Sequence, residues 1–415
     1  MNNFTFEAKQ KTFLGSLIGV GLICMIATFF VDADRFWSNY LHNAVFFTGV
    51  AVMTLFFVAA SVTAWGGWYT VFKRLWESMY SFLFVGFALV VVLVLAVDFD
   101  LAHLYHWSDP AEVAKDPLLM HKSSFLNKNW YTIASILIVG IWCFFAFKLR
   151  SLSLAEDNAT NDGAYAYHKK IRIWAAAFLP IAGFSSAAVI WQWVMSVDSH
   201  WYSTLYAWYA GASWFVGAMS LTVLLLTYLI SKGYFKNVTG EHIHDLGKLV
   251  FAFSIFWTYL WFSQFMLIWY SNNGEETIYF NTRMDQYPVL FYANLLINFV
   301  LPFFILMRND TKRKRGTIIT ASLFVFLGHW LDYFLMIKPG VAHTLHLHDW
   351  TMGYNLPGFL EIGTMLGFLG LFIFVVFSRL SKVPIEPKND PYLAESEHHH
   401  VGYGGGPMFE HGEHH

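Results

Sequence analysis

Long apolar runs alternate with short polar connections along the chain. Ten of these runs approach the length of about 20 residues that an α-helix needs to cross a bilayer, and charged or turn residues bound each one. They are Thr12–Val31, Asn43–Ala64, Met79–Val97, Asn129–Phe147, Trp174–Val197, Leu205–Ile230, Gly247–Tyr270, Gln286–Met307, Thr317–Ile337 and Gly358–Phe377. The pattern predicts an all-α polytopic membrane protein with ten transmembrane helices. A count of eight or nine spans is the alternative.

The first run resembles a signal peptide, because Lys9 and Lys11 precede it. It is, however, about 20 residues long and has no small-x-small cleavage pattern before Asp32. We therefore expect this segment to remain as a membrane helix.

Composition supports a membrane protein and excludes other classes. Only 13% of the 415 residues are charged, whereas soluble domains carry roughly 25%, so a soluble enzyme is excluded. The net charge of −2 offers no basic excess for binding nucleic acid. The two cysteines, Cys24 and Cys143, both lie in apolar runs, so the chain lacks the cysteine sets that hold iron–sulfur clusters, structural zinc or c-type haem.

Basic residues are distributed unevenly between the two sets of loops. The termini and the loops on their side carry 20 Lys and Arg residues, and the opposite loops carry 6, while the acidic residues divide 14 to 14. Cytoplasmic loops are enriched in Lys and Arg. We therefore predict that both termini are cytoplasmic, as an even number of spans requires.

The chain divides into a transmembrane domain, residues 1–380, and a tail, residues 381–415. The tail is rich in Pro, Gly and acidic residues and ends in a histidine-rich stretch. Such a composition cannot bury an apolar face, so we expect a disordered or partner-bound cytoplasmic extension. We favour a solvated tail, and weak metal binding by its histidines is the alternative.

Ionisable side chains within spans are costly and mark functional candidates. His329 and Asp332 share one helical face at i, i+3, close enough for the carboxylate to orient the imidazole. We assign proton transfer, or a position beside a quinone, to six residues that fall in the outer third of the spans or at their mouths: His329, Asp332, Glu361, Asp198, His200 and Gln264. The inner half is expected to hold almost only hydroxyl groups.

The chemistry of this group admits several interpretations. His with a carboxylate suits either a quinone-headgroup site or a proton half-channel. Packing hydrogen bonds are the third interpretation, which we favour for Gln192, Gln264, Asn294 and Asn298, whereas function is favoured for His329 with Asp332. His42 and His329 are the only histidines in or beside a span, so we expect no haem and no metal in this chain.

Several longer stretches resemble a known family. Met195–Tyr206, His244–Phe253, Phe256–Tyr270, Glu275–Thr277 and His329–Asp332 are similar to the membrane subunits of alternative complex III, which belong to the NrfD/polysulfide-reductase-like family. His244–Lys248, Glu275–Thr277 and His329–Asp332 resemble the F subunit more than the C subunit. The resemblance extends from the second span to Asp390–Tyr392. It implies two four-helix bundles, from spans two to five and six to nine, with flanking helices.

The resemblance also implies a role in a bacterial inner-membrane respiratory complex, a quinol:cytochrome c or quinol:oxidase oxidoreductase. Its expected partners are a paralogous NrfD-like C subunit, an iron–sulfur protein, multihaem and monohaem cytochrome c subunits, a terminal oxidase and lipids. Menaquinone or menaquinol is the expected small molecule, with haem c and iron–sulfur clusters only on partner subunits. The F subunit itself would carry protons, bind quinol, or serve as a structural scaffold beside a catalytic paralogue.

Overall fold

The protein is an all-α multi-pass membrane protein. The computed structural model describes residues 3–159, 161–347 and 351–400. Ten helical stretches in this part of the chain are long and apolar enough to cross a membrane, and each matches one predicted span. They are Ala8–Val31, Ala33–Thr63, Thr70–Asp98, Lys128–Asn158, Gly163–Val197, Leu205–Ser231, Gly240–Ser271, Pro288–Leu306, Arg315–Thr344 and Phe359–Leu380.

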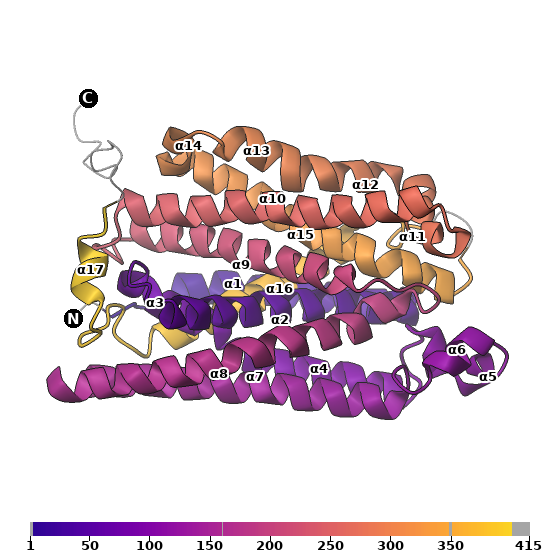
Figure 1. Cartoon of the computed structure of the whole chain (residues 1–415), viewed down its shortest axis with the longest axis horizontal. Coiled ribbons are helices and arrows are strands. Elements are labelled where there is room, and N and C mark those ends of the chain that lie inside the picture. Colours follow the sequence, from indigo (N-terminus) through magenta and orange to yellow (C-terminus); the bar gives the residue numbers. More distant parts are fainter. Residues whose placement is uncertain (1–2, 160, 348–350, 401–415) are drawn as a thin grey trace.

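These spans form two four-helix bundles and a flanking pair, as expected (Figure 1). The first bundle contains α2 (Ala33–Thr63), α3 (Lys73–Tyr80) with α4 (Leu83–Asp98), α7 (Lys128–Asn158) and α8 (Asn161–Trp193). The second contains α9 (Leu205–Ser231), α10 (Gly240–Ser271), α12 (Pro288–Leu295) with α13 (Leu301–Leu306), and α15 (Arg315–Thr344). The flanking pair is α1 (Ala8–Val31) and α16 (Phe359–Leu380).

Shorter helices lie within the spans, between them or after the last one. They are η1 (Thr70–Phe72), η2 (His106–Ser108), α5 (Pro110–Val113), α6 (Pro117–Lys122), η3 (Met195–Val197), α11 (Gly274–Gln286), the π-helical turn η4 (Leu296–Val300), α14 (Asn309–Arg313) and α17 (Leu393–Glu397). The N-terminus, α14 and α17 lie at one end of the molecule, here called the terminal end (Figure 1). The opposite end, which holds α5, α6 and α11, is called the α11 end.

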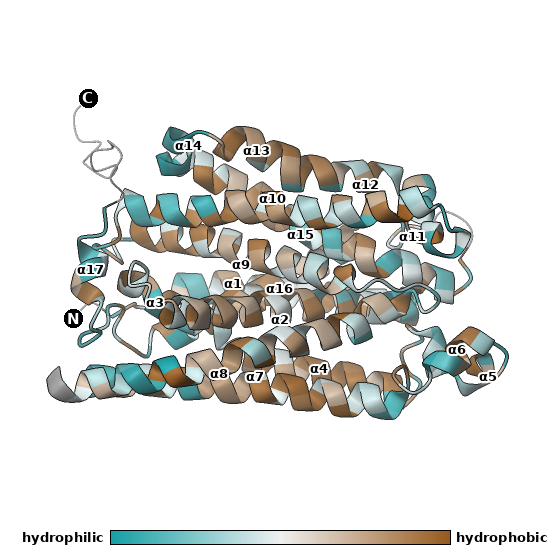
Figure 2. Ribbon diagram, viewed as in Figure 1, coloured by the Kyte–Doolittle hydropathy of each residue, from teal (hydrophilic) through white to brown (hydrophobic). Residues whose placement is uncertain are grey.

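Apolar side chains cover the outside of the bundles between these ends. Figure 2 shows hydrophobic residues along the middle of the helices and hydrophilic residues toward both ends. Helices α2 and α9 are mostly buried because they pack against each other between the bundles, whereas most of α1 is exposed. In a bilayer, lipid would cover that exposed apolar surface.

Glycine permits the close approach of the flanking pair. A Cβ atom built on Gly21 of α1 would lie 2.4 Å from the Cα atom of Gly367 in α16. Small residues let membrane helices come into backbone contact, where van der Waals packing rather than the hydrophobic effect holds them together. The two helices therefore form a tight pair beside the bundles.

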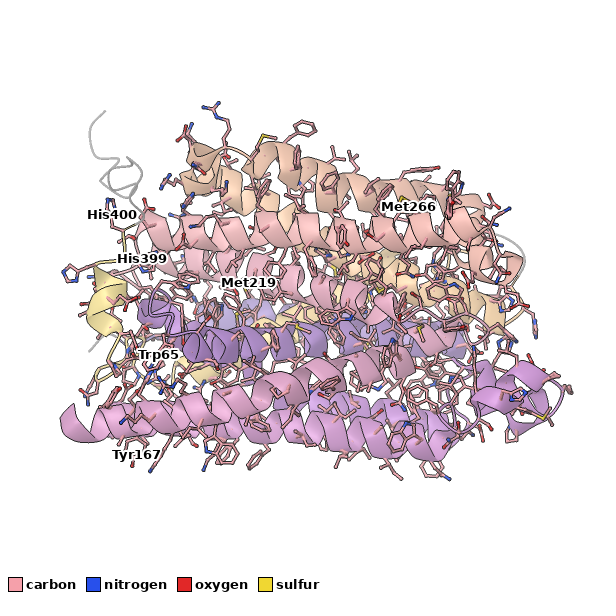
Figure 3. All side chains as sticks on the ribbon, viewed as in Figure 1. Trp65, Tyr167, Met219, Met266, His399 and His400 are labelled. Carbon is pink, nitrogen blue, oxygen red and sulfur yellow. The ribbon has the colours of Figure 1, made fainter. Side chains whose placement is uncertain are left out.

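The first part of the tail, within residues 381–400, packs against the rest of the chain, whereas its composition predicts a disordered or partner-bound extension. Ser396 is buried at the terminal end, where its hydroxyl donates to the Trp68 carbonyl at 2.6 Å and accepts from the Val71 amide at 3.1 Å. His399 lies beside the start of α10 (Figure 3), with its Nε2 2.7 Å from Asp245. Composition alone misses these specific contacts. The remaining tail residues, 401–415, lie outside the described residues.

Candidate functional site

Asp332 is a fully buried carboxylate at the centre of the second bundle. It accepts hydrogen bonds from the Tyr209 hydroxyl, from Trp257 Nε1 at 2.9 Å and from Asn294 Nδ2 at 2.8 Å. These donors come from α9, α10 and α12, so all three neighbouring helices converge on α15 at this point. None of the donors is a cation. Asp332 is therefore solvated by neutral groups rather than held in an ion pair.

His329 lies one turn from Asp332 but does not bind it. Its Nδ1 is 2.9 Å from the Ser213 hydroxyl, and its ring meets Trp257 edge to face at 5.4 Å. Its Nε2 is buried and has no hydrogen-bond partner among the described residues. The expectation that the carboxylate orients the imidazole directly is therefore wrong. The i, i+3 spacing places both groups on one face, and Trp257 contacts both of them.

Asn294 reaches Asp332 from an irregular helix. Its Oδ1 accepts from Asn298 Nδ2 at 2.6 Å, and both amides are buried. Asn298 lies within the π-helical turn η4, and Pro302 follows four residues later. Proline has no N–H for the carbonyl four residues before it, which accounts for a departure from regular α-helix there. The two amides thus form a hydrogen-bonded chain that ends at Asp332. The interpretation of Asn294 and Asn298 as packing contacts alone does not include this link to the carboxylate.

Arg283 connects this site to the α11 end. Its Nη2 donates to Asp198 at 2.8 Å, its Nη1 to the Tyr279 carbonyl at 3.0 Å and its Nε to the Leu335 carbonyl at 3.0 Å. The guanidinium also stacks on the Tyr279 ring at 3.4 Å. The Asp198 side chain is 20% exposed. Asp198 therefore joins a buried arginine to the surface, which is a contact that the sequence did not predict.

A small cavity lies between Arg283 and the donors around Asp332. Its volume is about 20 Å³, and its lining includes Tyr209, Gln264, Asn294 and Arg283. That volume is enough for one water molecule. The Nε2 atom of Gln264 is buried and has no partner among the described residues, so the cavity has a polar group suited to binding water. Gln264 therefore belongs to this site, together with His329, Asp332 and Asp198.

Glu361 lies apart from these four residues. It accepts from Arg35 at 2.8 and 2.9 Å, from Asn39 at 2.9 Å and from the Gly358 amide at 2.9 Å. Nearby, the buried Lys338 donates to Asn39 Oδ1 at 2.5 Å. Glu361 is thus an ion-paired carboxylate between α2 and α16. Lys338 was missed because the predicted ninth span stops at Ile337, whereas α15 continues through Pro339 to Thr344.

His200 also lies outside the Asp332 site. Its Nε2 is 2.5 Å from Oδ2 of Asp116, the residue before α6, and its side chain is 45% exposed. The hydrogen bond to His200 lowers the pKa of Asp116 below its ordinary value. His200 is close to Asp198 in sequence, but it faces a separate group of histidines at the α11 end.

A second polar network lies at the terminal end of the first bundle, where the sequence led us to expect almost only hydroxyls. Arg74 is fully buried and binds Glu77 at 2.5 Å, and it also pairs with Asp157. Lys73 bridges Glu156 at 3.2 Å and the tail residue Asp390 at 2.5 Å. That expectation is wrong because α3 begins before, and α7 ends after, the predicted spans. Residues assigned to a loop instead pack together on helices.

Comparisons with protein-family models and with curated proteins find no match to this chain. The candidate site therefore stands on its geometry, and the resemblance to alternative complex III stays a prediction.

Proposed function

We propose that this protein transfers protons through its second helical bundle, as the F-type membrane subunit of an alternative complex III-like quinol oxidoreductase. The observation that carries the proposal is Asp332. It is a fully buried carboxylate with neutral hydrogen-bond donors, and a water-sized cavity separates those donors from the Arg283–Asp198 pair.

The setting of Asp332 suits a carboxylate that changes its protonation state. Burial disfavours the charged form, while hydrogen bonds from Tyr209, Trp257 and Asn294 favour it. Burial and hydrogen bonding thus act on Asp332 in opposite directions. Glu361 differs because the Arg35 guanidinium binds both of its oxygens, which holds it in the charged form.

Buried hydroxyls extend the site toward the terminal end. Ser220, Ser254 and Ser322 are buried on α9, α10 and α15, and none of their hydroxyls has a partner among the described residues. Ser322 and Ser220 lie two helical turns beyond His329 and its partner Ser213, and Ser254 lies one turn beyond Trp257. Together these residues mark a polar route through a mostly apolar bundle.

The size of the central cavity favours proton transfer over quinol binding at Asp332. Sites for small molecules and cofactors usually enclose about 300–1,000 Å³, whereas the cavity beside Asp332 has about 20 Å³. We therefore place menaquinol oxidation on the paralogous C subunit. Electrons would pass from there to the iron–sulfur and haem c centres of partner subunits, and this chain would serve energy coupling.

The proposed setting is a bacterial inner membrane with both termini in the cytoplasm. The terminal end carries the 20 basic residues counted above, which supports this orientation. Asp198 and Arg283 would then open toward the outer side, where the proton route would release its protons.

The test uses the complete complex, purified with its partners and reconstituted into vesicles. Asp332→Asn and Asp198→Asn should lower the number of protons released per quinol oxidised, while the complex still assembles. Gln192→Leu is the matched control, because Gln192 is also buried with unpartnered amide atoms but lies on α8 in the first bundle. Unchanged proton release in both aspartate variants would leave only the structural-scaffold role.

A further inference from the structure

Four histidines gather at the α11 end, outside the Asp332 site. They come from three separate places in the chain: His106 from η2, His200 from the loop after η3, and His343 and His346 from the last turn of α15 and the residues after it. With Asp116 and Glu112, they line an open cavity of about 330 Å³. Packing does not account for these histidines, because the side chains of His200, His343 and His346 are exposed.

The imidazole rings lie close to one another, but slightly farther apart than ligands of one metal ion. The ring centre of His106 lies 5.9 Å from that of His200 and 5.6 Å from that of His343, and the latter two are 6.4 Å apart. His346 lies 5.9 Å from His106. Metal–nitrogen bonds of about 2.0–2.1 Å in a tetrahedral site put ring centres about 5 Å apart. Rotations of exposed side chains would close the remaining gap of about 1 Å.

Two of the rings are already oriented through one nitrogen. His200 uses Nε2 to bind Asp116, which leaves Nδ1 for another ligand. His106 places Nδ1 3.3 Å from the Thr344 hydroxyl, which leaves Nε2. Histidines that bind metals commonly hydrogen-bond a carboxylate or another oxygen atom through the second nitrogen, and that contact fixes the ring orientation.

The protonation state of His106 also suits coordination. Partial burial lowers its pKa, and the positive charges that His343, His200 and His346 acquire on protonation lower it further. The neutral imidazole, which is the form that binds metals, is therefore favoured at neutral pH. The nearby carboxylates Asp116 and Glu112 add negative charge, which attracts a divalent cation.

We propose that His106, His200 and His343, with His346 beside them, bind a divalent transition-metal ion of the zinc, copper or nickel class at the α11 end. Three or four imidazoles without thiolates select these ions over Mg²⁺ and Ca²⁺, which prefer oxygen ligands. The site does not depend on proton transfer at Asp332. It replaces the expectation that this chain binds no metal.

The test follows the reaction of individual histidines with diethyl pyrocarbonate in the full-length protein in detergent, read by peptide mass spectrometry. Stoichiometric Zn²⁺ should protect His106, His200 and His343, and Mg²⁺ should not. His121 is the internal control, because it is exposed at the same end but contributes to none of these ring contacts. Histidines of the tail are read on separate peptides, so zinc bound there does not obscure the result.

Two substitutions separate a metal site from simple shielding. His106→Gln should abolish the zinc protection of His200 and His343. Asp116→Asn should weaken zinc binding by about 10–100-fold, which is the usual effect of removing such a carboxylate partner. His121→Gln should change neither result. Equal labelling of wild-type His106 with and without zinc, or protection of His200 that survives His106→Gln, would overturn the proposal.

Discussion

Arg283 donates a hydrogen bond from Nε to the main-chain carbonyl of Leu335, 3.0 Å away in α15. That carbonyl is available because Pro339, four residues later, has no N–H with which to complete the helical hydrogen bond. A proline that would weaken an isolated helix thus creates an acceptor for a buried cation. The guanidinium in turn holds Asp198, so Pro339 helps to position the polar groups at the α11 end.

Arg283→Lys tests this arrangement. A lysine ammonium cannot reach the Leu335 and Tyr279 carbonyls and Asp198 with the geometry of a guanidinium, and we expect a loss of about 2–4 kcal/mol in the free energy of unfolding. Thermal unfolding in detergent measures the change. Arg308→Lys is the control, because the Arg308 side chain is exposed and its ion pair with the exposed Asp310 is long, at 3.5 Å. Equal stability of the two variants would contradict the account.

The pH dependence of stability tests the histidine cluster. Partial burial and the neighbouring histidines lower the folded-state pKa of His106 below its ordinary value of 6.5, so the unfolded chain binds protons more readily. Stability from this group is present above pH 6.5 and is lost as the pH falls through the lowered pKa. The melting temperature of metal-free protein should therefore fall less in His106→Gln than in wild type between pH 7.5 and 5.5. A matching His121→Gln variant, exposed and outside the cluster, should follow wild type.

Docking of the tail should depend on the Lys73–Asp390 ion pair. Asp390→Asn removes a partner 2.5 Å from the buried ammonium, and we expect faster tryptic cleavage at Lys382 and Lys388. Electrophoresis with mass spectrometry of the fragments measures the rate. Glu395→Gln removes a carboxylate from an exposed position of the same tail. Trypsin should cleave this variant at the wild-type rate. The same cleavage rate in Asp390→Asn would show that this pair does not hold the tail.

The α1–α16 contact gives a matched pair of glycine substitutions. Gly21→Val should destabilise the protein by about 1–3 kcal/mol, because its Cβ would overlap the Gly367 backbone. Gly19→Val should have little effect, since a Cβ on Gly19 would meet nothing within 4 Å. Thermal unfolding in detergent compares the two. A smaller loss for Gly21→Val than for Gly19→Val would contradict the close approach.

Sequence periodicity was enough to predict all ten spans, because the bilayer imposes one length and one polarity on each helix. It also singled out His329 and Asp332, whose spacing fixes a shared face. It did not predict their hydrogen-bond partners, since Tyr209, Trp257 and Asn294 arrive from other helices through tertiary packing. Each of these side chains alone is ordinary in a membrane helix.

Helix ends limited the prediction of buried charges. Arg74, Glu156 and Lys338 lie where hydropathy falls, so they were assigned to loops or span ends. In the structure, helices continue past those points, so that Arg74 and Glu156 are buried in ion pairs at the terminal end and Lys338 is buried against the Asn39 amide. Asp390 adds to the ion pairs at the terminal end from a tail that composition marks as disordered. Pairing between distant segments leaves no periodic signal in a single sequence.

The central claim is that Asp332 takes up and releases a proton during quinol turnover. Infrared difference spectroscopy of the working complex measures this directly, through the carbonyl stretching band of a protonated carboxyl group. The account predicts such a band in wild type and in Gln192→Leu, and its loss in Asp332→Asn. A band of equal size in an assembled Asp332→Asn complex, or no carboxyl band in wild type, would contradict it.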